Sequence, residues 1–156
     1  MNDVAAGRNA NKNGQTLQNK VMRIFSRKGV QTVNYRHYWK MAKQNKSILL
    51  KNVPYLNIAG ARTYSEFVLL HQKLKMPIRI ECKWQSSQGT LDEKLFLLYH
   101  NMTLCVREPV VIVIVDGGGA RDEWINWLKN ACNKTHDKDI KVMNIKEFSQ
   151  WVKQLL

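Results

Sequence analysis

Apolar residues recur at helical spacing near the start of the chain. Four of them stand at positions i, i+4, i+7 and i+8, which places them in one stripe of a helix: Leu17, Val21, Ile24 and Phe25. Gly29 follows and is typical of the end of a helix. Residues 1–13 are rich in Asn and show no such stripe. We therefore expect a flexible polar segment at 1–13 and a folded domain that begins at residue 14.

The rest of the chain alternates between strand-like and helix-like patterns. Strands are expected at residues 48–57, 64–70, 77–85, 110–115 and 140–145. Helices are expected from residue 90 to about residue 101, around Trp124 and Trp127, and around Phe148 and Trp151. This order predicts an α/β fold with helices flanking a mixed β-sheet. No linker divides it, so residues 14–156 are expected to form one domain.

Composition excludes several classes of protein. The longest apolar run, at residues 110–115, ends at Asp116 and is far shorter than the roughly 20 residues that span a bilayer. The polar start carries no apolar signal segment. The three cysteines, Cys82, Cys105 and Cys132, are odd in number and far apart, which argues against a disulfide framework. We expect a cytoplasmic protein without a membrane partner.

Charge points to a polyanionic partner. The formal net charge is +13, and eleven basic residues but one acidic residue stand among the first 51. A basic region on a folded domain favours nucleic acid, because each neutralised phosphate releases counterions. The candidate contacts on the first helix are Lys20, Arg23, Arg27 and Lys28. Arg36 and Lys40 stand among aromatic residues, a mixture that suits base stacking and phosphate contact but equally suits a strand edge or loop covering the core.

The candidate chemistry lies on the third expected strand. Strand side chains alternate between the two faces of a sheet, so residues 78–85 place an apolar set on one face and Glu81, Lys83 and Gln85 in a row on the other. Taken alone, this pattern also fits a strand with one solvated face. Glu66 stands 15 residues before Glu81 on the preceding strand, and a hairpin would bring the two carboxylates face to face.

Two carboxylates held together suit a divalent cation. At about 4 Å they repel each other by roughly 1 to 4 kcal/mol at effective dielectric constants of 80 to 20. A cation converts that penalty into binding, and hard oxygen ligands suit Mg²⁺ or Mn²⁺. The metal lowers the pKa of a bound water and neutralises charge on a phosphodiester under attack. A lysine beside it would hold the attacking water or stabilise the phosphate.

These residues resemble the motif of the PD-(D/E)XK nuclease superfamily, which has the restriction-endonuclease-like fold with an αβββαβ core. The motif here is Glu81-Cys82-Lys83 with the upstream acid Glu66. The longer string IECKWQ at residues 80–85, followed by Gly89 and by DEK at residues 92–94, is similar to the small stand-alone nucleases of this superfamily in bacteria and phages.

The resemblance implies a Mg²⁺-dependent endodeoxyribonuclease. Glu66 and Glu81 would bind the metal with the backbone carbonyl of Cys82, Lys83 would position the nucleophile, and Gln85 would support it. Lys94, in the first turn of the following helix, would contact DNA. Cleavage of both strands would need a homodimer or a partner subunit.

Two departures from the family pattern bear on activity. Ser65 stands where the name-giving proline would be, before a Glu instead of an Asp. Gln18 stands where many relatives have an acid on the first helix. The alternatives are therefore a catalytically inactive nucleic-acid-binding module with the same fold, or a subunit of a larger restriction or repair complex.

Overall fold

Six strands form one mixed β-sheet at the centre of the protein. The computed structural model describes residues 3–40, 47–85 and 91–156. The strands lie in chain order: β1 (Gln31–Asn34), β2 (Ser47–Leu56), β3 (Arg62–His71), β4 (Ile78–Trp84), β5 (Val110–Asp116) and β6 (Asp139–Met143). The β2–β3 and β3–β4 pairs are antiparallel and the other three are parallel. The expected α/β fold with a mixed sheet is thus confirmed.

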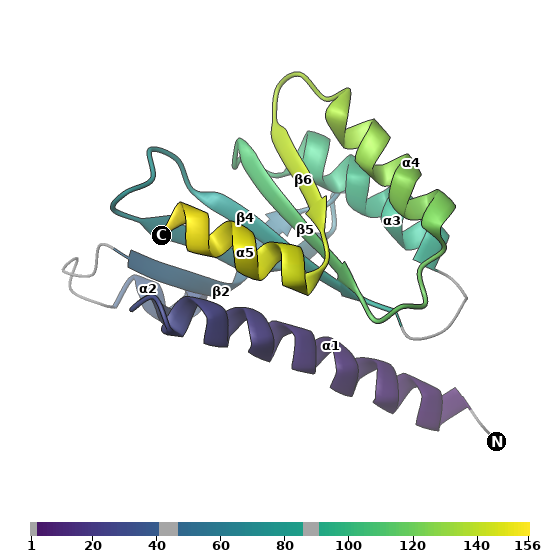
Figure 1. Ribbon diagram of the computed structural model, residues 1–156, viewed down its shortest axis with the longest axis horizontal. Helices are drawn as coiled ribbons and strands as arrows, with labels where there is room; N and C mark the ends of the chain where they lie inside the picture. The colour runs from purple at the N-terminus through teal and green to yellow at the C-terminus, as the bar shows by residue number, and fades with distance from the viewer. Residues whose placement is uncertain (1–2, 41–46, 86–90) are drawn as a thin grey trace.

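Helices cover the two faces of this sheet unequally (Figure 1). One face packs against α1 (Asp3–Ser26) and α5 (Ile145–Leu155), through a core that includes Leu17, Phe25 and Phe148. The other face packs against α3 (Leu91–His100), the short π-helix η1 (Asn101–Cys105) and α4 (Asp122–Asn133), mainly over β5 and β6. Among the helices in the described ranges, the short α2 (Tyr35–Tyr38) lies near β1 and β2 on that second face, where a third cluster includes Val33, Leu50 and Val68.

A polar row separates the two apolar clusters of the second face. In β4, Ile78, Ile80 and Cys82 point into the core under α1 and α5. The intervening residues Arg79 and Glu81 therefore point to the second face, between the cluster beneath α3 and α4 and the cluster over β1 to β3. The fold thus buries charged groups in the middle of its sheet, which is costly unless they are paired or bind an ion.

Several boundaries differ from those expected. The first helix begins at Asp3 instead of after residue 13, so the predicted lead-in is helical from Asp3. That segment has no proline to end the helix, and the buried stripe that follows nucleates turns that can extend into it. Thr90, the expected start of the helix that precedes β5, lies outside the described residues. The last strand ends at Met143, because Asn144 caps α5 in a capping box with Glu147.

Residues 31–38 contain two elements that hydrophobic periodicity did not indicate. β1 is only four residues long and pairs in parallel with β2, and Asn34 caps the one-turn α2 by accepting a hydrogen bond from the backbone N–H of Arg36. Four residues are too few for a periodic pattern to emerge. None of the described helices is both long enough and apolar enough to cross a membrane.

Candidate active site

A break in strand alternation sets up the candidate site. Asn52 in β2 has a φ of 58°, in the left-handed region. Val53 and Leu50 belong to the same apolar cluster although they are three residues apart, whereas residues on one face of a regular strand are two or four apart. Ser65 of β3 pairs with Val53. The hydroxyl of Ser65 therefore lies on the face that carries Glu81, although simple alternation from Phe67 would turn it to the other face.

Glu66 lies where β3 and β4 begin to separate. The register of the two strands runs from Leu69–Ile78 to Phe67–Ile80. Beyond the last pair, the backbone N–H of Cys82 donates a hydrogen bond to Glu66 Oε2 at 3.2 Å. A side-chain carboxylate thus accepts a bond from the main chain of β4 at the fork between the two strands, and its second oxygen points toward Lys83.

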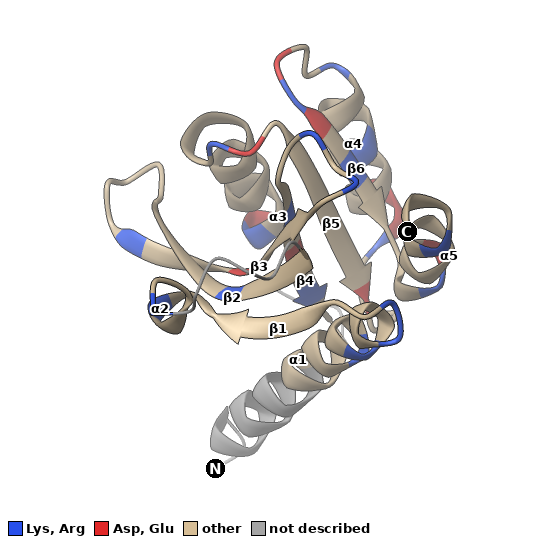
Figure 2. Ribbon diagram, turned by 90° about the vertical axis from the view of Figure 1, so that its left-hand side faces the viewer, with Lys and Arg blue, Asp and Glu red and all other residues tan. Residues whose placement is uncertain are grey.

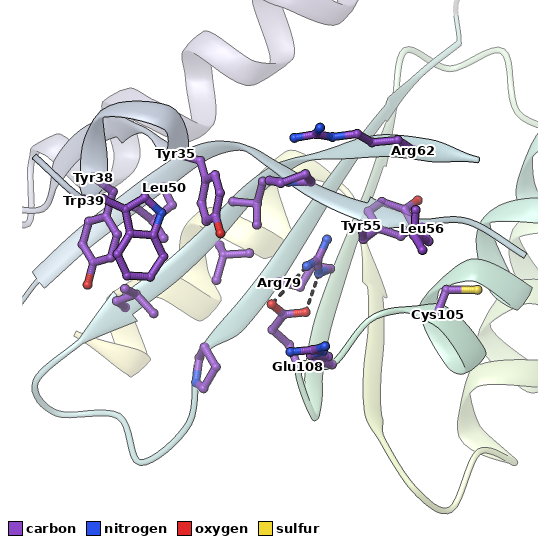
Figure 3. Close-up of a pocket in the computed structure, with 16 residues that line it drawn as sticks. Tyr35, Tyr38, Trp39, Leu50, Tyr55, Leu56, Arg62, Arg79, Cys105 and Glu108 are labelled. Atoms are coloured by element: carbon purple, nitrogen blue, oxygen red, sulfur yellow. Dashed lines mark hydrogen bonds and ion pairs between the residues drawn. The ribbon is translucent and has the colours of Figure 1, made fainter. Parts of the chain in front are cut away.

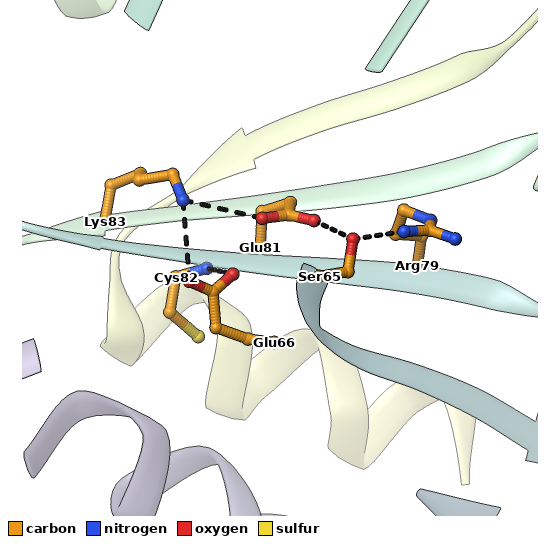
Figure 4. A network of polar contacts seen from close by, with 6 residues as sticks. All are labelled: Ser65, Glu66, Arg79, Glu81, Cys82 and Lys83. Carbon is orange, nitrogen blue, oxygen red and sulfur yellow. Dashed lines mark hydrogen bonds and ion pairs between the residues drawn. The ribbon is translucent and has the colours of Figure 1, made fainter. Parts of the chain in front are cut away.

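Lys83 joins the two carboxylates. Its Nζ lies 3.5 Å from Glu66 Oε1 and 3.5 Å from Glu81 Oε2 (Figure 4). Glu81 is 2% exposed, whereas the side chains of Glu66 and Lys83 are 18% and 27% exposed. The hairpin predicted from the sequence therefore brings these three groups together, with Glu81 at the bottom and the other two reachable from solvent. Their catalytic roles remain a prediction.

The two carboxyl groups differ in their affinity for protons. Burial, and then repulsion from Glu66, raises the pKa of Glu81 to about 8, despite the opposing effect of Lys83. Burial also acts to raise the pKa of Glu66, but the charge of Lys83 and hydrogen bonds from Glu81 and the Cys82 backbone outweigh it, so this pKa is lowered. Burial acts to lower the pKa of Lys83, and the two carboxylates raise it further than burial lowers it. The cluster therefore holds the Lys83 ammonium, the Glu66 carboxylate and the Glu81 carboxyl, which can ionise only against burial and the repulsion of Glu66.

A second set of buried groups holds Glu81 from behind. Arg79, 3% exposed, pairs with Glu108 through Nε–Oε2 at 2.6 Å and Nη2–Oε1 at 3.0 Å. The Arg79 Nη1 group donates to the hydroxyl of Ser65, and Ser65 donates to Glu81 Oε1. This chain fixes one oxygen of Glu81 and leaves the other facing Lys83.

Sequence reasoning missed this supporting chain. Arg79 had a signal, because it occupies the same alternating row as Glu81 and Lys83. Ser65 was noted only as a departure from the family motif. Glu108 had no signal, since it lies 29 residues from Arg79 beyond a π-helix, and tertiary structure alone brings the two together.

Gln85 lies just past the end of β4 against a glycine turn. Its backbone N–H donates to the Asp116 carbonyl at 2.9 Å, and the Gly119 N–H donates to the Gln85 carbonyl at 2.8 Å. Gly117 has a φ of 108°, and a Cβ there would lie 2.2 Å from the Gln85 carbonyl oxygen. The turn therefore requires glycine to hold the end of β4 in place. The support of Lys83 by the Gln85 side chain remains a prediction.

The cationic residues expected to contact nucleic acid are all exposed: Lys20, Arg23, Arg27, Lys28, Arg36, Lys40 and Lys94. Figure 2 shows basic positions in the described part of α1 and at α2. Among them, Lys20 has a contact that places it near the fork, because its Nζ lies 5.8 Å from the ring centroid of Trp84, next to Lys83. The buried stripe of α1 packs on the face opposite Glu81, so the helix flanks the site instead of covering it. Contact of these residues with nucleic acid remains a prediction.

The oxygen donors at the fork fit a hard divalent cation. Within the described part of the chain, no three His, Cys, Asp or Glu side chains gather to form a complete protein cage for a metal. Glu66 and Glu81 offer two carboxylates, to which the Cys82 carbonyl would add a third protein oxygen. Mg²⁺ commonly binds through one or two carboxylates and keeps several waters, which suits this incomplete donor set.

Comparison with known families agrees with this geometry. The model of the PD-(D/E)XK nuclease superfamily domain matches residues 9–156, nearly the whole chain. The chain therefore belongs to the PD-(D/E)XK nuclease superfamily, and its mixed sheet flanked by helices is consistent with the restriction-endonuclease-like fold. A search of curated proteins and a search of solved structures each found no match.

Proposed function

We propose that this member of the PD-(D/E)XK nuclease superfamily is a Mg²⁺-dependent endodeoxyribonuclease that hydrolyses phosphodiester bonds at the fork between β3 and β4. The observation that carries the proposal is the convergence of Glu66, Glu81 and Lys83, with Lys83 Nζ at 3.5 Å from both carboxylates. A lysine that served only in an ordinary surface ion pair would need one carboxylate partner, whereas Lys83 has two. A lysine between two carboxylates, one of them buried, is an arrangement whose cost is offset when a cation and a phosphate bind.

Mg²⁺, or Mn²⁺ in its place, would be held by Glu66, Glu81 and the Cys82 carbonyl. When bound, it supplies a water of lowered pKa and neutralises charge on the phosphate. Groups of the protein itself would orient the metal-binding carboxylates. Ser65 holds Glu81 in one orientation, and the Cys82 N–H holds Glu66, so the donor oxygens need little rearrangement.

Lys83 would act on the phosphate and on the attacking water. Its high pKa keeps the ammonium charged at neutral pH, so it donates hydrogen bonds and does not serve as a general base. With a cation bound, the charge of the two carboxylates would be neutralised where they stand, and the Lys83 ammonium would be free to donate to a phosphate oxygen or to the water. Gln85 would assist from the end of β4. The exposed cations on α1, with Arg36, Lys40 and Lys94, would hold the DNA backbone.

A plasmid-cleavage assay with a matched lysine control tests this function. Purified protein is incubated with supercoiled plasmid and Mg²⁺ or Mn²⁺, with EDTA as the metal-free control. We expect Lys83→Ala to retain DNA affinity while cleavage falls by about 10²-fold or more. The control is Lys141→Ala, because Lys141 also pairs with a carboxylate, Asp139 at 3.1 Å, but on the distant β6. Undiminished cleavage by Lys83→Ala would remove the assignment.

The same assay addresses the alternatives. Wild-type protein that binds plasmid without nicking it would favour an inactive binding module, the reading that Gln18 in place of a helix acid keeps open. Activity that appears only with a co-purified partner would favour a subunit of a larger complex. A free-standing enzyme that cuts both strands would elute as a homodimer in gel filtration, since a duplex cut needs two sites.

A further inference from the structure

A groove lies on the half of the second sheet face that α3 and α4 leave open. It has a volume of about 770 Å³, and β2, β3, β4 and the segments around α2 and η1 line it (Figure 3). Pockets of roughly 300–1,000 Å³ hold ligands the size of one or two nucleotides. Its chemistry divides into an aromatic end, with Tyr35, Tyr38 and Trp39, and a second end with Tyr55 and Arg62, and Arg107 also lines it.

The aromatic end presents a ring to solvent. Trp39 is 73% exposed, although tryptophan is among the residues most often buried by folding. Its ring meets Tyr38 at 5.3 Å and Tyr35 at 6.1 Å between centroids, both edge to face. The two tyrosines pack in turn on the apolar cluster of β1 to β3. The two tyrosines therefore contact the indole, and its exposure leaves part of it accessible to a stacking partner.

The floor of the groove suits nucleobases, and its far end suits phosphates. The floor is apolar, formed by Leu50, Val53 and Val68, which give a phosphate no partner. Arg62, at the end away from Trp39, and Arg107 are both exposed. With a net charge of +13, the protein attracts polyanions in general.

The groove borders a residue that supports the candidate active site. Arg79 lines it, and its guanidinium lies 5.2 Å from the ring centroid of Tyr55, another lining residue. The same Arg79 donates to Ser65, which donates to Glu81. The groove and the catalytic cluster are thus joined through one buried side chain on one face of the sheet.

From these contacts we infer that the groove binds a single-stranded segment of the DNA substrate, with a base stacked on Trp39 and the backbone near Arg62 and Arg107. The inference rests on the proposed function and adds to it a preference for DNA with a single-stranded part next to the scissile bond. Duplex DNA keeps its bases stacked inside the helix, so an exposed indole over an apolar floor has no partner there. An unpaired strand offers a base face at each nucleotide.

Binding of a fluorescently labelled twelve-residue oligo(dT), followed by anisotropy in EDTA so that nothing is cleaved, tests this inference. Stacking is worth about 1–3 kcal/mol per base, so Trp39→Ala should weaken binding at least about fivefold. Trp39→Phe keeps an aromatic face and should bind within about twofold of wild type. The matched control is Phe96→Ala on α3, since Phe96 is 52% exposed but lies outside the groove.

Equal affinities of Trp39→Ala and wild type for oligo(dT) would overturn the inference, as would a blunt duplex of the same length that loses affinity equally upon Trp39→Ala. Neither result touches the proposed function, which fails separately if the wild type does not cut plasmid or if Lys83→Ala cuts it normally. Loss of oligo(dT) affinity in Trp39→Ala with no plasmid cutting by wild type would leave a single-strand-binding groove on an inactive protein.

Discussion

Replacing Glu81 with glutamine should stabilise the metal-free protein. Gln has the shape of the protonated carboxyl, and its side-chain oxygen still accepts the hydrogen bond from Ser65. It carries no charge to be desolvated or repelled by Glu66, the two effects that raise the pKa of Glu81. The variant therefore removes this cost and preserves the packing, although its amide nitrogen replaces the oxygen that accepts from Lys83.

The size of the effect follows from the pKa of Glu81. The ordinary value is 4.5 and the folded value is about 8. A folded pKa above the unfolded one means that the folded state holds the proton more tightly, so the contribution of Glu81 to wild-type stability falls as pH rises from about 4.5 to about 8 and does not change outside that window. At about 1.36 kcal/mol per unit, this difference corresponds to at most about 5 kcal/mol. The amide nitrogen of the variant would face the Lys83 ammonium in place of an accepting oxygen, which opposes part of the gain, and we expect about 2 kcal/mol at pH 8.

Urea unfolding at pH 5, 6, 7 and 8 in EDTA measures this gain. The free energy of unfolding of Glu81→Gln should exceed that of wild type by an amount that grows with pH. Added Mg²⁺ should narrow the difference, because it binds and stabilises only the wild type. A variant that is less stable than wild type at every pH, or a difference that does not change between pH 5 and pH 8, would refute the reasoning.

Three further predictions concern the surroundings and the metal. Gly117→Ala should lower the free energy of unfolding by at least about 2 kcal/mol in thermal unfolding, because φ is 108° and the new Cβ would lie 2.2 Å from a carbonyl oxygen. The control Gly29→Ala, with φ 74° and no atom within 4 Å of the new Cβ, should lose less. Equal losses in the two variants would contradict this. Glu108→Gln should cost about 3 kcal/mol in urea unfolding by leaving the buried Arg79 without its counter-ion, and an unchanged midpoint would count against that. Calorimetric Mg²⁺ affinity should rise about tenfold per pH unit up to about pH 8, since Glu81 must lose its proton first, and a flat profile would exclude this coupling.

The sequence predicted much of the site because β4 is a regular strand. Alternation alone separates Ile80 and Cys82 from Glu81 and Lys83, and the structure has this separation. The hairpin between β3 and β4 then brings Glu66 near them, as the short turn suggested. Both steps depend only on local periodicity and chain length, which a single sequence contains.

The supporting contacts depend on exceptions to that periodicity. Asn52 in a left-handed conformation changes the alternation of β2, and Ser65 follows its partner strand. The sequence does not indicate this change, because an Asn within an expected strand can equally mark a turn or a regular strand position. The ion pair of Arg79 with Glu108 crosses from β4 to the segment after η1, a contact that no local rule fixes.

The basic first helix shows a similar limit. Periodicity identified its buried stripe, Leu17, Val21 and Phe25, but not which face of the sheet it covers. The structure places α1 on the face opposite Glu81, with Lys20 beside Trp84 at the end of β4. Charge counts therefore indicated a partner class, while the position of each cation relative to the fork required the tertiary structure.

Locating the metal itself is the most direct test of the account. Crystals of the protein grown with Mn²⁺ and DNA would be measured for anomalous scattering. We predict a peak in the fork between β3 and β4, within about 2.2 Å of carboxylate oxygens of Glu66 and Glu81. A fork without a peak at saturating Mn²⁺, or a metal bound only elsewhere, would contradict the account.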